Sequence, residues 1–340
     1  MVSLAQVRAH NAALKSLPQG LVAVFVGGTS GIGFSTAREF VRNTTAPHVY
    51  LVGRNDAEAT RIISELQQIN PSSKLDFIKS DVSLLHNVDE ACRQIKEKEQ
   101  RVNLLFMTVG YITMQGRQET SEGLDRKFAL HYYSRMRFVQ NLLPLLANAA
   151  DSQDKNANLS RVVSVFDPKL GRGGVLNTAD LSLKTTFSLR NCAVHASAMQ
   201  NFALEHFAKA QPGTSFIHAY PSGVNTGVLR GLGSTTERMI KAGAFLLRPF
   251  MVDFVESGER HLYAATAPQY VPSAKASGVD NVAKGADGVM GSGSYVLNWN
   301  GDSLPDSTTA EKMRAQGMEK TVWEHTEDVY RKICEEGAKY

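Results

Sequence analysis

Apolar positions along the chain gather in short runs that alternate with longer amphipathic stretches. The runs have the length of buried strands and predict strands over residues 21–26, 48–52, 75–78, 102–107, 161–165 and 214–219. The stretches between them predict helices over residues 32–43, 57–69, 88–98, 123–146 and 190–210. Repeated alternation of strand and helix favours parallel pairing with right-handed crossovers. The predicted fold class is therefore α/β, a doubly wound parallel sheet with helices on both faces.

The two ends of the chain depart from this alternation. Residues 1–19 predict a short helix that leads into the first strand. Beyond residue 227 the alternation is lost, and only a strand over 295–297 and a final helix near 311–333 are predicted. No evident linker precedes this tail. We therefore expect one domain over residues 1–340, with a helical extension (1–19), a core (20–227) and a C-terminal elaboration (228–340).

Composition and charge narrow the class of protein. Hydrophobic residues make up 43% of the 340 residues, enough for a sizeable core. The formal net charge of +4 comes from scattered basic residues, which argues against a nucleic-acid partner. Cys92, Cys192 and Cys334 show no C-x-x-C spacing, which argues against a disulfide framework or a zinc site. With no signal-peptide pattern at the start, we expect a cytoplasmic protein.

The most apolar stretch of the tail spans residues 239–255. Lys241, Arg248, Pro249 and Asp253 interrupt it, so we do not expect it to cross a bilayer. It predicts a pair of helices that covers a pocket or forms a subunit contact. Peripheral attachment to a membrane is the alternative.

A glycine-rich turn follows the first predicted strand. Its glycines permit a tight turn and a close approach of the backbone to a pyrophosphate, and the next helix offers N–H groups to phosphates. The turn joins strand to helix in a βαβ unit, the context that supports dinucleotide binding over a turn without a ligand. The residues expected to contact the dinucleotide are Gly27, Thr29, Ser30, Gly31, Ile32 and Gly33. Residues 20–227 would then be a dinucleotide-binding core, and the tail would cover the substrate as a lid.

Two further positions bear on the choice of dinucleotide. The second predicted strand ends at Gly53 and Arg54, where a ribose 2′-hydroxyl calls for an acid and a 2′-phosphate calls for a cation. Arg54 therefore predicts NADP(H), and a solvated surface arginine is the alternative. Asp81 and Val82 are placed to line the adenine pocket, Asp81 through its carboxylate and Val82 through its backbone. An Asp at a helix start can also serve only as a cap.

These features resemble the short-chain dehydrogenase/reductase family. The resemblance rests on Gly27, Gly31 and Gly33 at family spacing, Asp81-Val82, Gly110, and Pro221-Ser222-Gly223-Val224-Asn225-Thr226. It covers about residues 20–230, and residues 122–125 and 131–138 are similar to fungal members that tailor natural products. It implies a Rossmann-type fold with a nicotinamide across the strand ends and a substrate under a C-terminal lid. Gly110, Pro221 and Thr226 would then join the cofactor site, with Thr226 near the carboxamide or the pyrophosphate.

The residues that transfer the proton in this family are missing. Family enzymes use an Asn, a Ser that orients the carbonyl, a Tyr that transfers the proton, and a Lys that lowers the tyrosine pKa and binds the ribose. Matched by position, these sites fall on His131, Asp167, Cys192 and Ala196. Residues 189–205 contain neither Tyr nor Lys, so no shift of register restores the pair. General acid–base catalysis contributes about 10²- to 10⁴-fold, so other residues must substitute if the chemistry is kept.

Asp167 is the residue that we expect to act as the replacement acid. It follows the fifth predicted strand in an expected apolar cleft, where desolvation raises the pKa of a carboxyl group. Protonated, it could donate to a carbonyl or an imine nitrogen, and ionised, it could stabilise an iminium or abstract a proton. We expect His131 to pair with it across the pocket. The alternative is that Asp167 only caps the turn at Pro168. Tyr111 is a further candidate donor, with simple packing as its alternative.

Cys192 and His195 lie one helical turn apart and can face one side of the helix. A thiol with an ordinary pKa of about 8.5 could donate a proton. The favoured interpretation of Cys192 is nevertheless a small apolar residue that fills the space of the absent tyrosine. His195 could reach the ribose in place of the lysine, and a structural histidine with satisfied hydrogen bonds is the alternative.

Three functions compete. The first is an NADP(H)-dependent reductase of secondary metabolism that acts on a carbonyl or an imine or iminium of a bulky apolar intermediate, with Asp167 as acid. The second is a redox-neutral cyclase or isomerase, in which positioning supplies most of the rate. The third is a non-enzymatic NADP(H)-binding regulator. We favour the reductase because the glycine turn and Arg54 are intact. We expect a small-molecule substrate, no metal and, from the resemblance, a homodimer or homotetramer.

Overall fold

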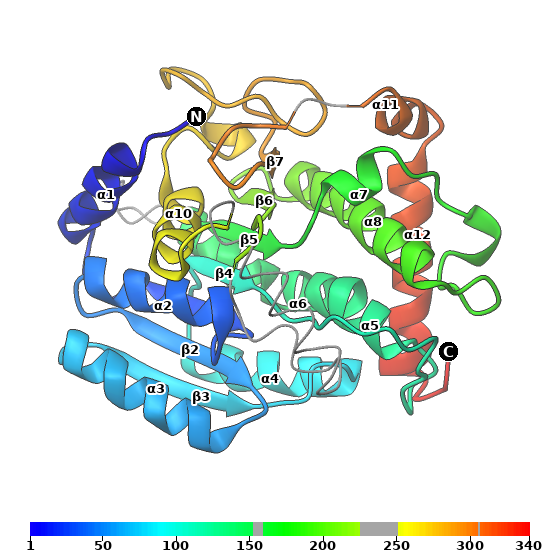
Figure 1. Cartoon of the computed structure of the whole chain (residues 1–340), viewed down its shortest axis with the longest axis horizontal. Coiled ribbons are helices and arrows are strands. Elements are labelled where there is room, and N and C mark those ends of the chain that lie inside the picture. Colours follow the sequence, from blue (N-terminus) through cyan, green and yellow to red (C-terminus); the bar gives the residue numbers. More distant parts are fainter. Residues whose placement is uncertain (152–158, 225–250, 305–306) are drawn as a thin grey trace.

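One parallel sheet organises the molecule. The computed structural model describes residues 1–151, 159–224, 251–304 and 307–340. Within these residues, seven strands lie in the order β3-β2-β1-β4-β5-β6-β7, and each pairs in parallel with its neighbours (Figure 1). They are β1 (Val22–Val26), β2 (His48–Gly53), β3 (Lys74–Lys79), β4 (Leu104–Met107), β5 (Arg161–Val165), β6 (Ser215–Ala219) and β7 (Ser294–Leu297). The order confirms the doubly wound sheet and reverses between β1 and β4, where such sheets place their ligands.

Helices cover both faces because successive strand residues point to opposite sides. In β1, Val24 belongs to the core on one face, and Phe25 belongs to the core on the other. The first core is completed by α4 (Leu85–Lys98), α6 (Ser134–Ala150), α8 (Leu189–Ala210) and α12 (Met318–Tyr330). The second core is completed by α2 (Gly31–Asn43), α3 (Asp56–Ile69) and α10 (Phe254–Thr266).

The predicted helix over 123–146 starts later and is not uniform. It begins with α5 (Arg126–Phe128), where the Asp125 carboxylate accepts a hydrogen bond from the Phe128 N–H at 2.9 Å. A π-helical segment, η2 (Ala129–Tyr133), then leads into α6. Such segments often occur at functional sites, and the pattern of apolar residues does not reveal them.

The tail adds a strand to the sheet and helices to the layers around it. The predicted strand over 295–297 is β7, which pairs with β6. The sequence did not predict α10, which lies so close to α2 that a Cβ on Gly258 would be 2.3 Å from Ser35 Oγ. The buried side chain of Arg161 donates hydrogen bonds to the carbonyls of Ala264, Ala267 and Tyr270. This cation therefore satisfies carbonyls at and beyond the C-terminal end of α10.

The predicted final helix is two helices, α11 (Thr308–Ala315) and α12. Gly317 separates them with a φ of +76°, a conformation that ends α11. The other short helices of the described residues are η1 (Leu14–Ser16), α7 (Lys169–Arg172), η3 (Thr178–Asp180), η6 (Ser273–Lys275) and η7 (Arg331–Glu335). In the part of the chain that the structure describes, no helix has the length and hydrophobicity of a membrane span.

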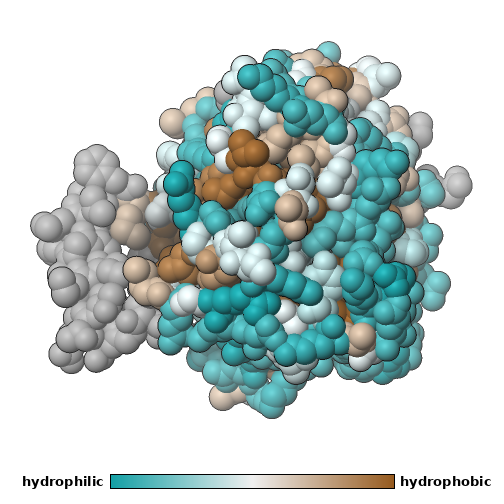
Figure 2. All heavy atoms as spheres, turned by 90° about the vertical axis from the view of Figure 1, so that its right-hand side faces the viewer, coloured by the Kyte–Doolittle hydropathy of each residue, from teal (hydrophilic) through white to brown (hydrophobic). Residues whose placement is uncertain are grey.

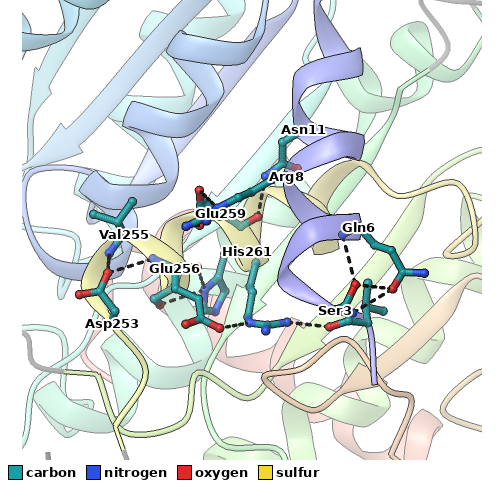
Figure 3. Close-up of polar contacts among 12 residues, drawn as sticks. Ser3, Gln6, Arg8, Asn11, Asp253, Val255, Glu256, Glu259 and His261 are labelled. Atoms are coloured by element: carbon teal, nitrogen blue, oxygen red, sulfur yellow. Dashed lines mark hydrogen bonds and ion pairs between the residues drawn. The ribbon is translucent and has the colours of Figure 1, made fainter.

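The predicted N-terminal helix is confirmed as α1 (Leu4–Ala13), which packs on α10 (Figure 3). Ser3 starts α1 with a capping box, in which its hydroxyl accepts from the Gln6 N–H and the Gln6 side chain accepts from the Ser3 N–H. The Arg8 guanidinium pairs with the Glu259 carboxylate at 2.8 Å, and Asn11 donates to the Glu259 carbonyl at 2.9 Å. The first residues of the chain are thereby attached to its last third.

Candidate functional site

The glycine turn after β1 is too tightly packed for side chains. Gly27 has a φ of +87°, and a Cβ there would lie 2.8 Å from Thr108 Oγ1. A Cβ on Gly33 would lie 2.4 Å from the Gly27 carbonyl oxygen. Gly31 has a φ of +54° and is the first residue of α2. The first turn of α2 therefore packs closely against the end of β1. The free N–H groups of this helix start are then available to a phosphate at the strand ends.

The residues around this turn leave its outer side accessible. Ser30 is exposed and extended, and its side chain does not cap α2. Gly31 and Ile32 are half-buried. Thr29 faces β2, since a Cβ on Gly53 would lie 2.8 Å from Thr29 Oγ1. The predicted phosphate-contacting residues thus form one turn whose backbone can be approached closely.

A cavity of about 390 Å³ lies beside the ends of β2 and β3. It is lined by Arg54, Ile78, Lys79, Ser80, Asp81, Asn87, Glu90, Ala91 and Gln94. Exposed Arg54 supplies a cation at one wall, and no ion pair holds it within the described ranges. The structure therefore places Arg54 and Asp81 in the wall of one cavity. The predicted contacts to a 2′-phosphate and to an adenine need the two residues to be this close.

Asp81 has protein partners of its own. It accepts hydrogen bonds from the Ser83 N–H at 3.1 Å and the Ser83 hydroxyl at 2.8 Å, and it pairs with Arg126 at 3.0 Å. Burial acts to raise the pKa of Asp81, but the Ser83 hydrogen bonds and the charges of Arg126 and Arg54 lower it overall. The Val82 carbonyl accepts from the Ser134 hydroxyl, and its side chain lies in the core. Asp81 thus holds the turn that precedes α4 but does not cap that helix, since the first N–H groups of α4, those of Leu85 and His86, donate to the Glu122 carboxylate.

Asp167 lies half-buried two residues beyond β5. Its Oδ1 accepts a hydrogen bond from the Lys169 N–H at 2.9 Å, so the carboxylate caps the start of α7. Its carbonyl accepts from the Ser197 hydroxyl at 2.8 Å, and Ser197 Oγ accepts from the Gly171 N–H at 2.9 Å. Ser197 therefore fixes the Asp167 backbone and α7 against α8. The cap that was the alternative for Asp167 is present, and a role as acid stays a prediction.

His131 is a buried residue of η2 whose ring lies beside Gly110, on the loop after β4. A Cβ on Gly110 would lie 2.6 Å from His131 Nε2, and the His131 ring packs on Phe166 with centroids 4.8 Å apart. Its Nδ1 is buried without a hydrogen-bond partner among the described residues. Burial, followed by the charges of Arg135 and Lys127, holds the pKa of His131 well below its ordinary value. Among the described residues, His131 forms no hydrogen bond or ion pair with Asp167, so the predicted pairing is not found.

Cys192 and His195 share the core-facing side of α8. Cys192 is fully buried, and burial followed by the charge of Asp125 raises the pKa of its thiol to about 12. His195 Nε2 accepts from the Asn177 N–H at 3.1 Å, and its Nδ1 lies 3.2 Å from the Leu181 carbonyl. Burial lowers the pKa of His195. Both ring nitrogens thus have backbone partners, which fits the structural alternative, and reaching a ribose would require giving them up.

Tyr111 is half-buried on the loop after β4. Its hydroxyl donates to Gln118 Oε1 at 3.4 Å, and burial followed by the charge of Asp125 raises its pKa. After β6, Pro221 is half-buried, and Ser222 has a φ of +62°. Thr226 and most of the predicted cover over 239–255 lie outside the described residues.

Known proteins are similar to this chain over nearly its whole length. A family model described as short chain dehydrogenase matches residues 21–165. An oxidoreductase of Emericella nidulans is 44% identical over 345 residues, with 97% of this chain and 98% of the relative covered. A short-chain dehydrogenase/reductase of Stachybotrys chartarum is 32% identical over 358 residues, with 96% of each chain covered. The chain belongs to the short-chain dehydrogenase/reductase family.

Solved structures share the fold of this short-chain dehydrogenase/reductase. The NADPH-bound carbonyl reductase from chicken fatty liver matches with a TM-score of 0.55 at 15% identity, covering 84% of this chain and 99% of that chain. An NADPH-bound short chain oxidoreductase from Pseudomonas aeruginosa, described as containing an atypical catalytic center, matches with a TM-score of 0.52 at 21% identity, covering 74% and 92%. At these identities the likeness shows the fold alone.

Sequence reasoning missed a buried arginine in this short-chain dehydrogenase/reductase. Arg135 is 1% exposed and donates to Ser164 Oγ and the Val165 carbonyl, both at 2.8 Å, and to the carbonyls of Leu130 and Val109. No carboxylate of the described chain pairs with it, and burial lowers its pKa. Arg135 thus ties the end of β5 to the loop after β4. An arginine one turn after His131, on the core side of a helix, was the available signal.

Tyr220 and Lys169 also lie at this edge of the sheet and were not singled out by their sequence context. Tyr220 directly follows β6, and Lys169 begins α7 after β5. Neither belongs to the glycine turn or to the helix on which the family places its tyrosine and lysine, so no motif marked them.

Proposed function

We propose that this protein is an NADP(H)-dependent reductase that acts on a carbonyl or an imine or iminium carbon of a bulky apolar molecule of secondary metabolism. The observation that carries the proposal is the packed glycine turn, where Gly27 and Gly33 leave no room for a Cβ, beside a cavity walled by Arg54. The relatives are fungal oxidoreductases, and solved structures of similar fold are named as NADPH-bound.

The residues present fit a dinucleotide. The turn over residues 27–33 would hold the pyrophosphate through N–H groups, and Arg54 would pair with a 2′-phosphate. His131, whose Nδ1 has no hydrogen-bond partner in the described part of the chain, and Arg135 lie at the ends of the central strands, where the family resemblance expects the nicotinamide. When bound, NADPH supplies a hydride.

Exposed apolar side chains favour a bulky apolar substrate. On the loop after β4, Ile112 is 42% and Met114 is 75% exposed, and after β5, Leu170 is 42% and Val175 is 72% exposed. Both segments leave the carboxyl ends of strands, where ligands of such sheets bind. Figure 2 shows apolar side chains gathered among hydrophilic ones on one face of the molecule. Exposed apolar side chains that gather in this way are typical of a binding region.

Asp167 is proposed as the acid of this reaction. Its Oδ1 accepts from Lys169 N–H, which fixes the carboxyl group at the end of β5. Protonated, it would donate to the oxygen or nitrogen that gains charge as the hydride arrives. Ionised, it would stabilise an iminium that is already electrophilic.

The deciding experiment uses NADPH with a panel of bulky carbonyls and imines, among them benzil and dihydroisoquinoline. Loss of reduced-nicotinamide absorbance in step with a reduced product supports the reductase. A redox-neutral cyclase or isomerase is the second candidate, which the sealed thiol of Cys192 favours because that thiol is a poor proton donor. A rearranged product formed without NADPH consumption would establish this second candidate and overturn the first.

The role of Asp167 is tested by Asp167→Asn. The asparagine oxygen still accepts the Lys169 N–H, so α7 is kept while the acid is lost, and kcat with an imine should fall about 10²- to 10⁴-fold. Asp287→Asn is the matched control, since Asp287 Oδ1 accepts the Val289 N–H at 3.0 Å in the same geometry on the loop before β7. Full kcat in Asp167→Asn would remove the acid role.

A further inference from the structure

The ends of β5 and β6 bring together three polar residues from two segments. Val165 pairs with Ala219, and the Phe166 N–H donates to the Ala219 carbonyl at 3.1 Å. The two segments therefore leave the sheet side by side, one leading to Asp167 and Lys169 and the other to Tyr220. This places a phenol, an ammonium and a carboxylate at the edge where ligands of doubly wound sheets bind.

The ammonium of Lys169 lies over the phenol ring. Lys169 Nζ is 3.9 Å from the centroid of the Tyr220 ring, a cation–π contact. Each partner is also fixed by its own backbone. The Lys169 N–H donates to Asp167 Oδ1 at 2.9 Å, and the Tyr220 N–H donates to the Leu297 carbonyl of β7 at 2.9 Å. These backbone hydrogen bonds therefore hold both Lys169 and Tyr220 in place for the cation–π contact.

The surroundings keep the phenol protonated. Tyr220 is half-buried, and burial followed by the charge of Asp167 raises its pKa. At neutral pH its hydroxyl is therefore a donor. Negative charge that develops on the phenol oxygen would be stabilised by the nearby ammonium of Lys169.

We propose that Tyr220 takes over the role of proton donor from Asp167 when the substrate is a carbonyl, with Lys169 as the residue that positions it and stabilises its phenolate. This assignment rests on the proposed reductase function. The carbonyl carbon gains a hydride from the reduced dinucleotide, the C=O π electrons move to the oxygen, and the oxygen takes the Tyr220 hydroxyl proton. The phenolate then regains a proton from water. The carbonyl gains two electrons and becomes an alcohol, and the dinucleotide loses the same two.

The assignment predicts a difference between substrate classes. A neutral carbonyl needs a proton as its oxygen becomes negative, whereas an iminium becomes a neutral amine once it accepts a hydride. Tyr220 should therefore matter for carbonyl reduction and much less for reduction of a preformed iminium, such as N-methylated dihydroisoquinolinium.

The pairing is tested without turnover by carbon-13 NMR of the intact protein carrying labelled tyrosine, with the Tyr220 signal assigned by Tyr220→Phe. Lys169→Met should shift the Tyr220 signal, and Lys169→Arg should preserve it because arginine also stacks on aromatic rings. Lys184 lies 4.1 Å from the Tyr340 ring, beside α12, and provides a matched pair. Lys184→Met should shift only Tyr340. An unmoved Tyr220 signal in Lys169→Met would overturn the positioning role.

The chemistry is tested with the carbonyl probe that the panel identifies. Tyr220→Phe should lower kcat about 10²- to 10⁴-fold, with KM for NADPH changed by less than about three-fold. Tyr340→Phe should retain kcat. If no probe consumes NADPH, the proposed function fails and the donor role fails with it. If NADPH is consumed but Tyr220→Phe keeps full kcat on a ketone, only the role of Tyr220 is overturned.

Discussion

Cys192 is a thiol sealed inside the core beneath the candidate site. It is fully buried in the core formed by α4, α6, α8 and α12, and the raised pKa of about 12 keeps its proton in place. A group with this pKa and no access to solvent is a poor acid at neutral pH. The contacts therefore fit a small apolar residue that fills volume, at the position matched to the family's tyrosine.

Cys192→Ala is expected to retain kcat within about two-fold, because only packing is lost, and to lower the free energy of unfolding by about 1 kcal/mol. Cys192→Ser introduces a hydroxyl into the same apolar space and should cost about 1–3 kcal/mol. Urea denaturation and steady-state kinetics on both variants check this. A hundred-fold loss of kcat in Cys192→Ala at unchanged stability would show that the thiol takes part in the chemistry.

Arg54 is the residue that should separate NADPH from NADH. A charge-assisted hydrogen bond to a phosphate contributes about 1.5–3 kcal/mol, so Arg54→Ala should weaken NADPH binding about 10- to 100-fold. Binding of NADH should change little, because it lacks the phosphate. Isothermal titration at two salt concentrations measures both. Arg61→Ala is the control, since Arg61 is engaged by Glu58 and Glu65 on α3. Equal losses for both dinucleotides would contradict the assignment.

Site residues could be predicted from the sequence where a local motif fixes their position. The glycine turn is recognisable because its conformation and packing exclude side chains at fixed spacing. Lys169 and Tyr220 could not be predicted, since their neighbours are set by the pairing of β5 with β6 and by the packing of α7. Their positions depend on strand register, which cannot be read from a single sequence.

At the scale of elements, four described residues other than glycine lie in the left-handed region, Ala46, Leu183, Ser222 and Asn281, and two of them make a useful contrast. Ser222, after β6, has a φ of +62°, and Leu183, before α8, has a φ of +57°. Left-handed backbone costs such residues about 1 kcal/mol relative to glycine. The two positions differ in burial, since the Leu183 side chain is fully buried and Ser222 is half-buried.

Substitution by glycine should therefore have opposite effects at these turns. Ser222→Gly should raise the free energy of unfolding by about 1 kcal/mol, because strain is relieved and little packing is lost. Leu183→Gly should lower it by about 2–4 kcal/mol, because the lost burial exceeds the relieved strain. Thermal and urea denaturation of the two variants measure this. A destabilised Ser222→Gly would mean that the serine side chain stabilises its turn.

Elements with apolar periodicity were predictable, and α10 was not. Its buried face includes Ser257, Gly258 and His261 beside Leu262 and two alanines, so few large apolar residues mark it. Small residues are used there because α2 approaches closely at Ser35. Predicted strands and helices with large apolar faces agree with the structure within a few residues. The composition of α10 therefore explains why the alternation of strands and helices was not recognised in this part of the tail.

At the scale of the whole molecule, several imidazoles are enclosed as neutral groups. Burial lowers the pKa of His218 to about 3 and those of His261 and His325 to about 4, and it holds that of His131 well below its ordinary value. In the unfolded chain these groups take up protons below about pH 6.5. Their contribution to stability is therefore complete above that pH and is lost as the pH falls toward the folded values.

The denaturation midpoint in urea should be constant above about pH 7 and fall between about pH 6 and 5. Each such histidine adds up to about 1.4 kcal/mol per pH unit to this slope. His261→Gln keeps a donor for the Ser257 carbonyl but does not titrate, so it should reduce the slope by that amount. Equal midpoints at about pH 7 and 5 would contradict the enclosure of neutral imidazoles.

The attachment of α1 to α10 has a consequence for how the chain is made. Asn11 and Glu259 are 248 residues apart in the sequence, and the Val2 N–H donates to the Asn300 carbonyl at 3.3 Å. Synthesis at about 5–20 residues per second delays the arrival of α10 by tens of seconds. During synthesis α1 thus waits for α10, the helix that it contacts most. During that interval its buried residues, Val7 among them, stay open to chaperones.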